Sequence, residues 1–408
     1  MSPVRPAEAT RELIDHRLDL RERAGLEFFE AEAERIARLC HRMAERFARG
    51  GRLIAAGFSP AARSDVRHVA VEFVHPVIVG KRALPALGLT GESGGVSHEL
   101  ALATEPEDIV LAFGEPGDRP ELAAGIAAAR SRGCLTISFS ELGAEWVLEP
   151  PSQDPFVRQE LVETLYHVLW ELVHVFFEHR GLLEGRTQRR SHDAGASSFL
   201  YPFLAEREDD LDAVLADVRE SVLMKAAEVQ ALRVATLHGA APELAEAAAA
   251  MRSSFEAGGR LLALGNGGSA TDATDVVADF AWPPARFGWA PRRAIDLTAD
   301  TAIITAIAND IGTEAIFARQ IIAYGRAGDV LLALSTSGNS LSVLDALAEA
   351  RRRELTTVAL VGYDGGRVAA QQLADHIVIA PSQHIPRIQE AQATAYHLLR
   401  ELVELPPG

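Results

Sequence analysis

Two short segments in the second half of the chain are rich in glycine and hydroxyl side chains, a composition that suits anion binding. They read Gly265-Asn-Gly-Gly-Ser269 and Ser335-Thr-Ser-Gly-Asn-Ser340. Each follows an apolar run and opens a helical pattern, so backbone N–H groups and the field of a helix N-terminus would face an anion there. The same residue types are common in ordinary turns and N-caps. Two such loops in one sheet favour phosphate binding.

These loops need a parallel sheet to position them, because ligands of open α/β sheets bind beyond the carboxyl ends of the strands. Short apolar runs alternate with helical segments throughout the chain, which predicts a parallel sheet covered by helices on both faces. The strands predicted for the second half are Leu261–Leu264, Ala294–Leu297, Val330–Leu334, Thr357–Val361 and His376–Ile379. Long helices are predicted over 8–48 and 207–237, followed by another over 241–257.

The first half of the chain repeats the framework of the second half. Three segments correspond in the same order: 51–57 with 259–265, 108–113 with 329–334, and 159–167 with 389–397. Self-similarity of this kind indicates duplication. We therefore predict two tandem α/β domains, 1–180 and 204–408, joined by a linker over 181–203 and packed as a pseudo-dimer.

Composition bounds the possible functions. The chain has 408 residues, 48% of them hydrophobic, which is enough for two cores. Its net charge of −17 argues against a nucleic-acid partner. No apolar run approaches the ~18 residues of a membrane span, and the N-terminus lacks the apolar core of a secretory signal. A cytoplasmic protein without a membrane partner is expected, with Cys40 and Cys134 as buried free thiols.

The second half resembles a known family. The segments that carry the resemblance are the two loops, Ala306–Gly312, Gly362-Tyr-Asp-Gly-Gly366 and Arg387-Ile-Gln-Glu390. They are similar to the sugar isomerase (SIS) domain, and within it to the sedoheptulose 7-phosphate isomerase group and its non-catalytic relative that binds the bacterial replication initiator. The resemblance covers residues 205–405. The first half, about 8–180, matches only in its framework.

The resemblance implies two SIS domains, each a five-stranded parallel sheet sandwiched by helices (α/β/α). It implies a phosphosugar isomerase that acts as a homodimer and needs no nucleotide cofactor. The residues implied to bind the phosphosugar are Asn266, Gly267, Ser269, Asp310, Ser335, Thr336, Ser337, Ser340 and Gln389. Of these, the hydroxyl residues would hold the phosphate, and Asn266 and Asp310 would contact the sugar.

Family members carry His-x3-Glu on the helix after the first loop and Gln-x7-His on the C-terminal helix, and these four side chains hold zinc. A spacing of four residues places two side chains on one helix face. The corresponding second-half residues are Asp275, Asp279, Gln389 and His397. Two Asp thus replace His and Glu, which leaves zinc, a weaker or different divalent ion, or ordinary acids on a helix as alternatives. The acid–base pair would be Asp279 and His397.

The first half has the whole family tetrad, His68, Glu72, Gln159 and His167, with Glu72 and His167 in the acid–base positions. Its phosphate loops are replaced by 57–63 and 114–119. A divalent metal such as zinc in the first domain and a vestigial site are both open. So is a composite site, in which the phosphate loops of the second half serve acid–base groups of the first.

Two function classes follow. One is an aldose–ketose isomerase of a sugar phosphate. The other is a non-catalytic binder or scaffold, which the Asp substitutions, Pro386 in place of the family's Asp, and the altered first domain favour. An interaction protein that no longer binds sugar is a third alternative. The sequence names neither the sugar nor the pathway.

Overall fold

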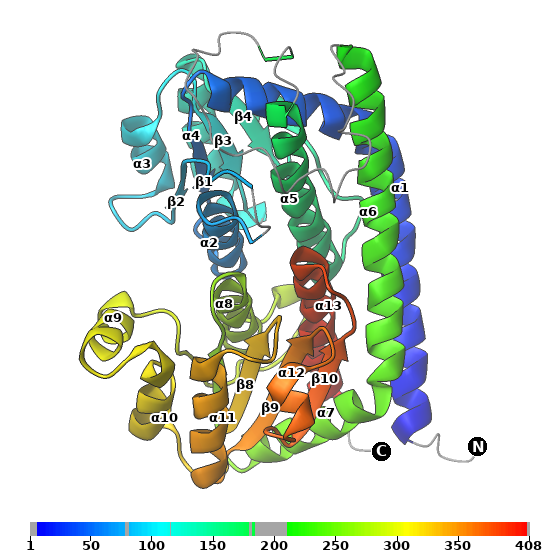
Figure 1. Ribbon diagram of the computed structural model, residues 1–408, viewed down its shortest axis with the longest axis vertical. Helices are drawn as coiled ribbons and strands as arrows, with labels where there is room; N and C mark the ends of the chain where they lie inside the picture. Colours follow the sequence, from blue (N-terminus) through cyan, green and yellow to red (C-terminus); the bar gives the residue numbers. More distant parts are fainter. Residues whose placement is uncertain (1–5, 78–80, 115, 179–181, 184–209, 406–408) are drawn as a thin grey trace. The chain divides into compact units, whose positions relative to one another are not determined.

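The computed structural model describes residues 6–77, 81–114, 116–178, 182–183 and 210–405. Within these residues the strands form two five-stranded parallel sheets (Figure 1). The chain divides into two compact units. We call Ala24–Ala227 the N unit, and Met1–Arg23 together with Glu228–Gly408 the C unit.

Two long helices, α1 (Pro6–Ala48) and α6 (Leu211–Gly239), contribute to both units. The first part of α1 places Ile14 in the apolar core of the C unit, whereas Phe28 lies in the core of the N unit. Likewise Val218 of α6 packs in the N unit. Each of these two helices thus belongs in part to one unit and in part to the other. Most of the predicted linker, 181–203, lies outside the described residues, so the boundaries at 180 and 204 stay predictions.

The N unit has the strand order β2-β1-β3-β4-β5. Its strands are β1 (Leu53–Ala56), β2 (Ala86–Leu89), β3 (Ile109–Ala112), β4 (Leu135–Ser138) and β5 (Trp146–Val147). Its other elements are α2 (Pro60–Val74), α3 (Val96–Ala103), η1 (Pro116–Asp118), α4 (Arg119–Ser131) and α5 (Pro155–Glu178). The central strands β1, β3 and β4 are wholly buried, as expected of a parallel sheet with helices on both faces.

The C unit has the strand order β10-β9-β8-β6-β7. Its strands are β6 (Leu261–Leu264), β7 (Ala294–Asp296), β8 (Val330–Ser335), β9 (Thr356–Gly362) and β10 (His376–Ala380), so all five predicted strands are confirmed. Its other elements are α7 (Ala241–Glu256), α8 (Gly268–Ala281), η4 (Ala285–Phe287), α9 (Thr301–Asp310), η5 (Thr313–Ala315), α10 (Ala318–Tyr324), α11 (Leu341–Arg352), α12 (Gly366–Ala370) and α13 (Ile385–Glu404).

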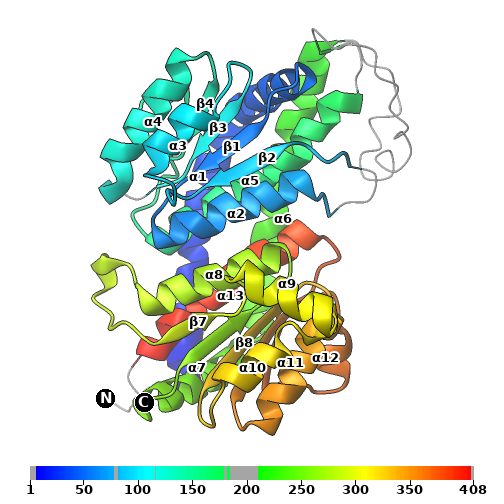
Figure 2. The ribbon, with the colours of Figure 1, turned by 90° about the vertical axis from the view of Figure 1, so that its left-hand side faces the viewer.

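Helices cover both faces of the C-unit sheet, which confirms the predicted α/β/α class. One apolar core joins the sheet to α7, α8 and α13, and another joins its other face to α10 and α11 (Figure 2). The second core includes Phe317, Ile321 and Leu347. Strand and helix thus alternate along the chain, and the carboxyl end of each strand leads into a loop at one edge of the sheet.

The two sheets share their strand order, because β2-β1-β3-β4-β5 and β7-β6-β8-β9-β10 follow the same sequence of crossovers. They also share an ion pair between the starts of neighbouring strands. Arg52 lies 2.6 Å from Asp108 in the N unit, and Arg260 lies 2.9 Å from Asp329 in the C unit. The repeated framework seen in the sequence is therefore also a repeated structure.

In the described part of the chain, no helix is both long enough and apolar enough to cross a membrane. Cys40 and Cys134 are buried free thiols, as predicted.

Candidate functional site

The loop between β6 and α8 is shaped by its glycines. A Cβ on Gly265 would lie 2.1 Å from the Ser269 carbonyl oxygen, so no other residue fits there. Gly267 has a φ of +58°, and a Cβ added to it would meet no described atom within 4 Å. The loop is thus tightly closed on one side and open at Gly267. Ser269, in the first turn of α8, is buried.

The loop between β8 and α11 is held by its own hydroxyl groups. The Gly338 N–H donates to Ser335 Oγ at 3.1 Å, and the Asn339 N–H donates to Ser337 Oγ at 3.2 Å. Gly338 has a φ of +61°, and a Cβ there would lie 2.2 Å from the Gly365 carbonyl oxygen. The loop is therefore packed backbone to backbone against the turn that follows β9.

The two loops meet at one edge of the sheet. Leu264 of β6 is in register with Ala333 of β8, so both strands end side by side. The Asn266 side chain donates from Nδ2 to Ser342 Oγ at 3.0 Å, which ties the first loop to the first turn of α11. Two helix N-termini and the predicted phosphate-binding hydroxyls thus share this edge. Asp310 is different: it is exposed at the end of α9 and its carboxylate accepts from the neighbouring Asn309.

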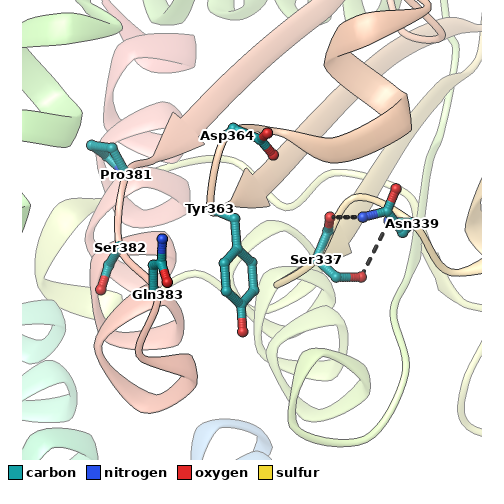
Figure 3. A pocket seen from close by; sticks show the side chains of 7 residues that line it. All are labelled: Ser337, Asn339, Tyr363, Asp364, Pro381, Ser382 and Gln383. Atoms are coloured by element: carbon teal, nitrogen blue, oxygen red, sulfur yellow. Dashed lines mark hydrogen bonds between the residues drawn. The ribbon is translucent and has the colours of Figure 1, made fainter.

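A pocket of about 630 Å³ opens at the carboxyl ends of β8, β9 and β10 (Figure 3). It is lined by Ser337, Asn339, Tyr363, Asp364, Pro381, Ser382 and Gln383. The Tyr363 ring extends into it between Gln383 and Ser337 (Figure 3). Of these lining residues, only Ser337 belongs to the predicted site. Five of the others lie in the loops after β9 and β10, which lack the glycine- and hydroxyl-rich sequence of the loops after β6 and β8.

Three buried side chains on α8 and α13 form an acidic cluster in the C unit. The His397 Nε2 atom lies 3.4 Å from Asp279 Oδ2 and 3.7 Å from Asp275 Oδ2. The Tyr396 hydroxyl donates to Asp275 Oδ2 at 2.7 Å. The predicted pairing of these helix positions is therefore present. Gln389, eight residues before His397 on α13, is also buried.

The N unit has a matching cluster on α2 and α5. The Nε2 atoms of His68 and His167 lie 3.3 Å apart, and His68 Nε2 lies 4.0 Å from Glu72 Oε1. The Tyr166 hydroxyl lies 3.1 Å from His68 Nδ1. All of these side chains are buried, whereas Gln159, near the start of α5, is half-buried.

Burial decides the protonation of the N-unit cluster. It lowers the pKa of His68 well below its ordinary value, and the nearby His167 acts in the same direction. Burial also raises the pKa of Glu72 to about 7, an effect that His167 opposes and Glu171 reinforces. Of the described residues, none makes a hydrogen bond to Glu72 Oε2. The neutral imidazole is the form that binds a metal, whereas the raised pKa of Glu72 favours its protonated form, so a bound metal would have to displace that proton.

Both clusters fit a divalent ion by donor type and spacing. In each, one atom from every side chain lies within 4.8 Å of the others. Two nitrogen ligands about 2.0–2.1 Å from a tetrahedral zinc are themselves about 3.4 Å apart, close to the separation of His68 and His167. Two imidazoles and a carboxylate suit zinc, whereas one imidazole and two carboxylates make the C-unit cluster a harder donor set.

The N-unit loops lack the donors of the C-unit loops. After β1 the chain enters α2 at Pro60, which has no backbone N–H to offer. After β3, the strand that corresponds to β8, the chain enters α4 through Arg119 and Pro120, and Pro120 also lacks a backbone N–H. Each of the two corresponding helix starts thus has one amide donor fewer.

Known proteins share this arrangement. A family model described as SIS domain matches residues 226–362, which include both C-unit loops. The phosphoheptose isomerase of Rhodospirillum rubrum is 43% identical over 164 residues, which are 40% of this chain and 86% of that protein. The phosphoheptose isomerase of Pelobacter propionicus is 43% identical over 165 residues, 40% of this chain and 85% of that protein. The chain belongs to the phosphoheptose isomerase family.

The SIS-type fold extends beyond the matched residues. The C-terminal domain of glucosamine-fructose-6-phosphate aminotransferase from Francisella tularensis has a TM-score of 0.57, covering 96% of this chain and 93% of that chain. Their identity is 8%, so this likeness concerns the fold alone. The sequence match to the phosphoheptose isomerases thus covers only part of this chain. The likeness of fold extends over nearly all of it.

Sequence reasoning missed the role of two tyrosines. Tyr166 and Tyr396 each precede the histidine of their cluster and contact the first member of the pair on the facing helix, His68 or Asp275. The signal was available, because the Tyr-His pair recurs in both halves of the chain. Tyr363 was also missed as a pocket residue, although its segment, Gly362–Gly366, is one of those that carry the family resemblance.

Proposed function

We propose that the C unit binds a sugar phosphate and interconverts its aldose and ketose forms. The observation that carries this proposal is the joined pair of loops at the ends of β6 and β8, open at Gly267 and tied together by Asn266 and Ser342. The relatives are phosphoheptose isomerases. Sedoheptulose 7-phosphate is accordingly the first substrate to test.

The phosphate would be held without any cationic side chain. Hydroxyl groups and backbone N–H groups at the N-termini of α8 and α11 supply donors and a favourable field. The proposed phosphate ligands are Ser269, Ser335, Thr336, Ser337 and Ser340. The sugar would contact Asn266, the backbone of Gly267, Gln389 and Asp310, the last only if α9 approaches the ligand.

The acid–base pair we propose is Asp279 and His397. Aldose–ketose interconversion moves a proton between two adjacent carbons, so it needs a base that takes the proton and an acid that returns one. The carboxylate and the imidazole lie 3.4 Å apart, so one substrate could lie within reach of both. Both side chains are buried, which strengthens their interaction with a developing charge.

A divalent metal such as zinc, when bound, would polarise the substrate carbonyl. Asp275, Asp279, Gln389 and His397 are the residues that would hold it in the C unit. The N-unit set is His68, Glu72, Gln159 and His167. In both units, the preceding tyrosine would fix the orientation of one ligand residue, as second partners of metal ligands commonly do.

A phosphosugar binder without turnover is the second candidate. One substitution favours it: Asp275 and Asp279 stand where the family pattern has His and Glu. Asp side chains are also shorter than the His and Glu that the family pattern has at these positions. A protein that only binds phosphosugars would retain the phosphate-binding loops but lack a working acid–base pair.

Proton–deuterium exchange at the carbon next to the carbonyl separates the two candidates. The full chain is incubated in heavy water with a panel of C5, C6 and C7 sugar phosphates, with and without added zinc. Deuterium incorporation with at least one sugar is the expected result. Binding by calorimetry without any incorporation would establish the binder, and an absence of both would contradict the proposal as a whole.

A further inference from the structure

We propose that Tyr363 is a specificity-determining residue that contacts the uncharged, hydroxylated part of a sugar phosphate in the 630 Å³ pocket. The inference rests on the proposed function, since it assumes a phosphate at the loop that follows β8. It assigns the neighbouring loops, after β9 and β10, to recognition of the sugar chain. Neither loop has a phosphate-type sequence.

The backbone at Tyr363 is held in a conformation that few side chains adopt. Its φ is +54°, in the left-handed region where a bulky residue costs on the order of 1 kcal/mol or more. The neighbouring backbone fixes this geometry. The Tyr363 N–H donates to the Ser382 carbonyl oxygen at 3.1 Å, and the Gly365 N–H donates to the Gly362 carbonyl oxygen at 2.8 Å.

Close approaches on both sides leave this turn no room to move. A Cβ on Gly362 would lie 2.4 Å from the Thr336 carbonyl oxygen and 2.6 Å from Ile388 of α13. A Cβ on Gly366 would lie 2.3 Å from the Ser337 carbonyl oxygen. The turn after β9 thus packs closely against both the loop that follows β8 and helix α13. The backbone position of Tyr363 is therefore held by this close packing.

The ring has one apolar side and one side that faces the pocket. It packs against a small apolar cluster formed by Leu232, Ala380, Ile388 and Ala391. The phenol end extends into the pocket between Gln383 and Ser337 (Figure 3). An aromatic ring with a polar tip can pack against the C–H groups of a sugar and also bond to one of its hydroxyls.

The chemistry of the pocket wall points to an uncharged polyol. Ser337, Asn339, Ser382 and Gln383 offer neutral donors and acceptors. The carboxylate of Asp364 is exposed and accepts from the Gly366 N–H at 3.0 Å, so it serves its own turn. The seven lining residues include no cationic side chain, which argues against a second anionic group here. A sugar chain attached to a phosphate at Ser337 meets these conditions.

The test is calorimetric binding to the full chain, with inorganic phosphate and with C5, C6 and C7 sugar phosphates as probes. Tyr363→Phe removes one neutral hydrogen bond and should lower the affinity for sugar phosphates by roughly 3- to 10-fold. Tyr363→Ala should lower this affinity further and change the preference for the length of the sugar chain. Inorganic phosphate, which has no sugar chain to place against the ring, should bind as in the wild type. Tyr324→Phe, a change to a partly exposed tyrosine on α10, is the matched control.

Two outcomes would overturn the inference alone: sugar phosphates bound equally well by wild type and both Tyr363 variants, or a loss that is equal for inorganic phosphate and sugar phosphates. The second would mean that Tyr363 only supports the loop. Wild-type chain that binds no sugar phosphate would overturn the proposed function together with this inference. Because Tyr363→Phe keeps the ring, it remains informative if Tyr363→Ala unfolds in a thermal melt.

Discussion

The N unit and the C unit have the same sheet but different loops. Strand order, the Arg–Asp ion pair and the Tyr-His pair on the last helix recur in both. The loops do not recur: the C unit keeps small residues and hydroxyls at two adjacent strand ends, whereas at the corresponding places in the N unit Pro60 and Pro120 each remove a backbone donor from the start of a helix. The framework of a fold and the binding site it carries can thus change independently.

The buried clusters differ in the opposite sense. The N unit retains His68, Glu72 and His167, and the C unit has Asp275, Asp279 and His397 at the same places. The unit with the phosphate-type loops therefore has the harder, more acidic set. Our account places binding and acid–base chemistry in the C unit and the stronger zinc site in the N unit. Each assignment can be tested by matched changes in the two units.

The largest expected effect is on turnover. Asp279→Asn removes the proposed general base and should lower the isomerisation rate by roughly 10²- to 10⁴-fold. The matched change in the N unit, Glu72→Gln, should leave the rate within a few-fold of wild type. Initial rates on whichever C5–C7 sugar phosphate the wild type converts are the measurement. A large loss of rate in folded Glu72→Gln, together with little loss in Asp279→Asn, would assign the acid–base role to the N-unit residues instead.

Zinc should stabilise the chain through the N unit. At a zinc concentration ~1,000 times the dissociation constant, binding to the folded state adds about 4 kcal/mol of stability. His68→Ala combined with His167→Ala should abolish that gain and remove zinc from the purified protein. Asp275→Ala combined with His397→Ala should not. Thermal melts with and without zinc, together with elemental analysis, check this. Zinc retained by the first variant and lost by the second would reverse the assignment.

Acid should destabilise the N unit through His174. Burial lowers the pKa of this histidine to about 4, an effect that is opposed by the carbonyl oxygens of Trp170 and Arg82, which lie 2.8 Å and 2.9 Å from its ring nitrogens. Between pH 4 and its ordinary value of 6.5, the unfolded chain binds more protons than the folded one. The stabilisation is therefore complete above pH 6.5 and falls by about 3 kcal/mol as the pH drops toward 4.

His174→Gln tests this prediction because its side chain cannot titrate. Urea unfolding at neutral pH and at a pH of about 4 gives the free energy of unfolding for each protein. The variant should begin less stable than wild type and lose less stability over the same pH interval. Parallel losses in the two proteins would show that His174 does not carry the acid sensitivity.

The sequence predicts much of the C unit because its signals are local. Each strand is a short apolar run before small residues, and both loops are contiguous segments, so strand positions and the shared edge follow from pattern alone. In the N unit, β5 has two residues and β2 is partly exposed, which leaves little apolar pattern to read. The division of α1 and α6 between the two units was not predictable either, because both keep a helical pattern throughout.

The pocket could not be predicted for a different reason. Its lining joins three loops from β8, β9 and β10, and Tyr363 points into it only because glycines at 362 and 366 allow close backbone contacts. Such contacts are set by tertiary packing. The position of Asp310 relative to the ligand is likewise a matter of how α9 packs, and every residue of α9, which lies wholly in the described part of the chain, is at least partly exposed.

The central claim is that the loops of the C unit hold the phosphate, and calorimetry on a double variant tests it most directly. Ser337→Ala combined with Ser340→Ala should weaken sugar-phosphate binding by roughly 1–3 kcal/mol, because hydrogen bonds to a charged group are lost. Arg119→Ala, at the corresponding place in the N unit, should leave the affinity unchanged. Undiminished binding in the double variant, or a comparable loss in Arg119→Ala, would contradict the account.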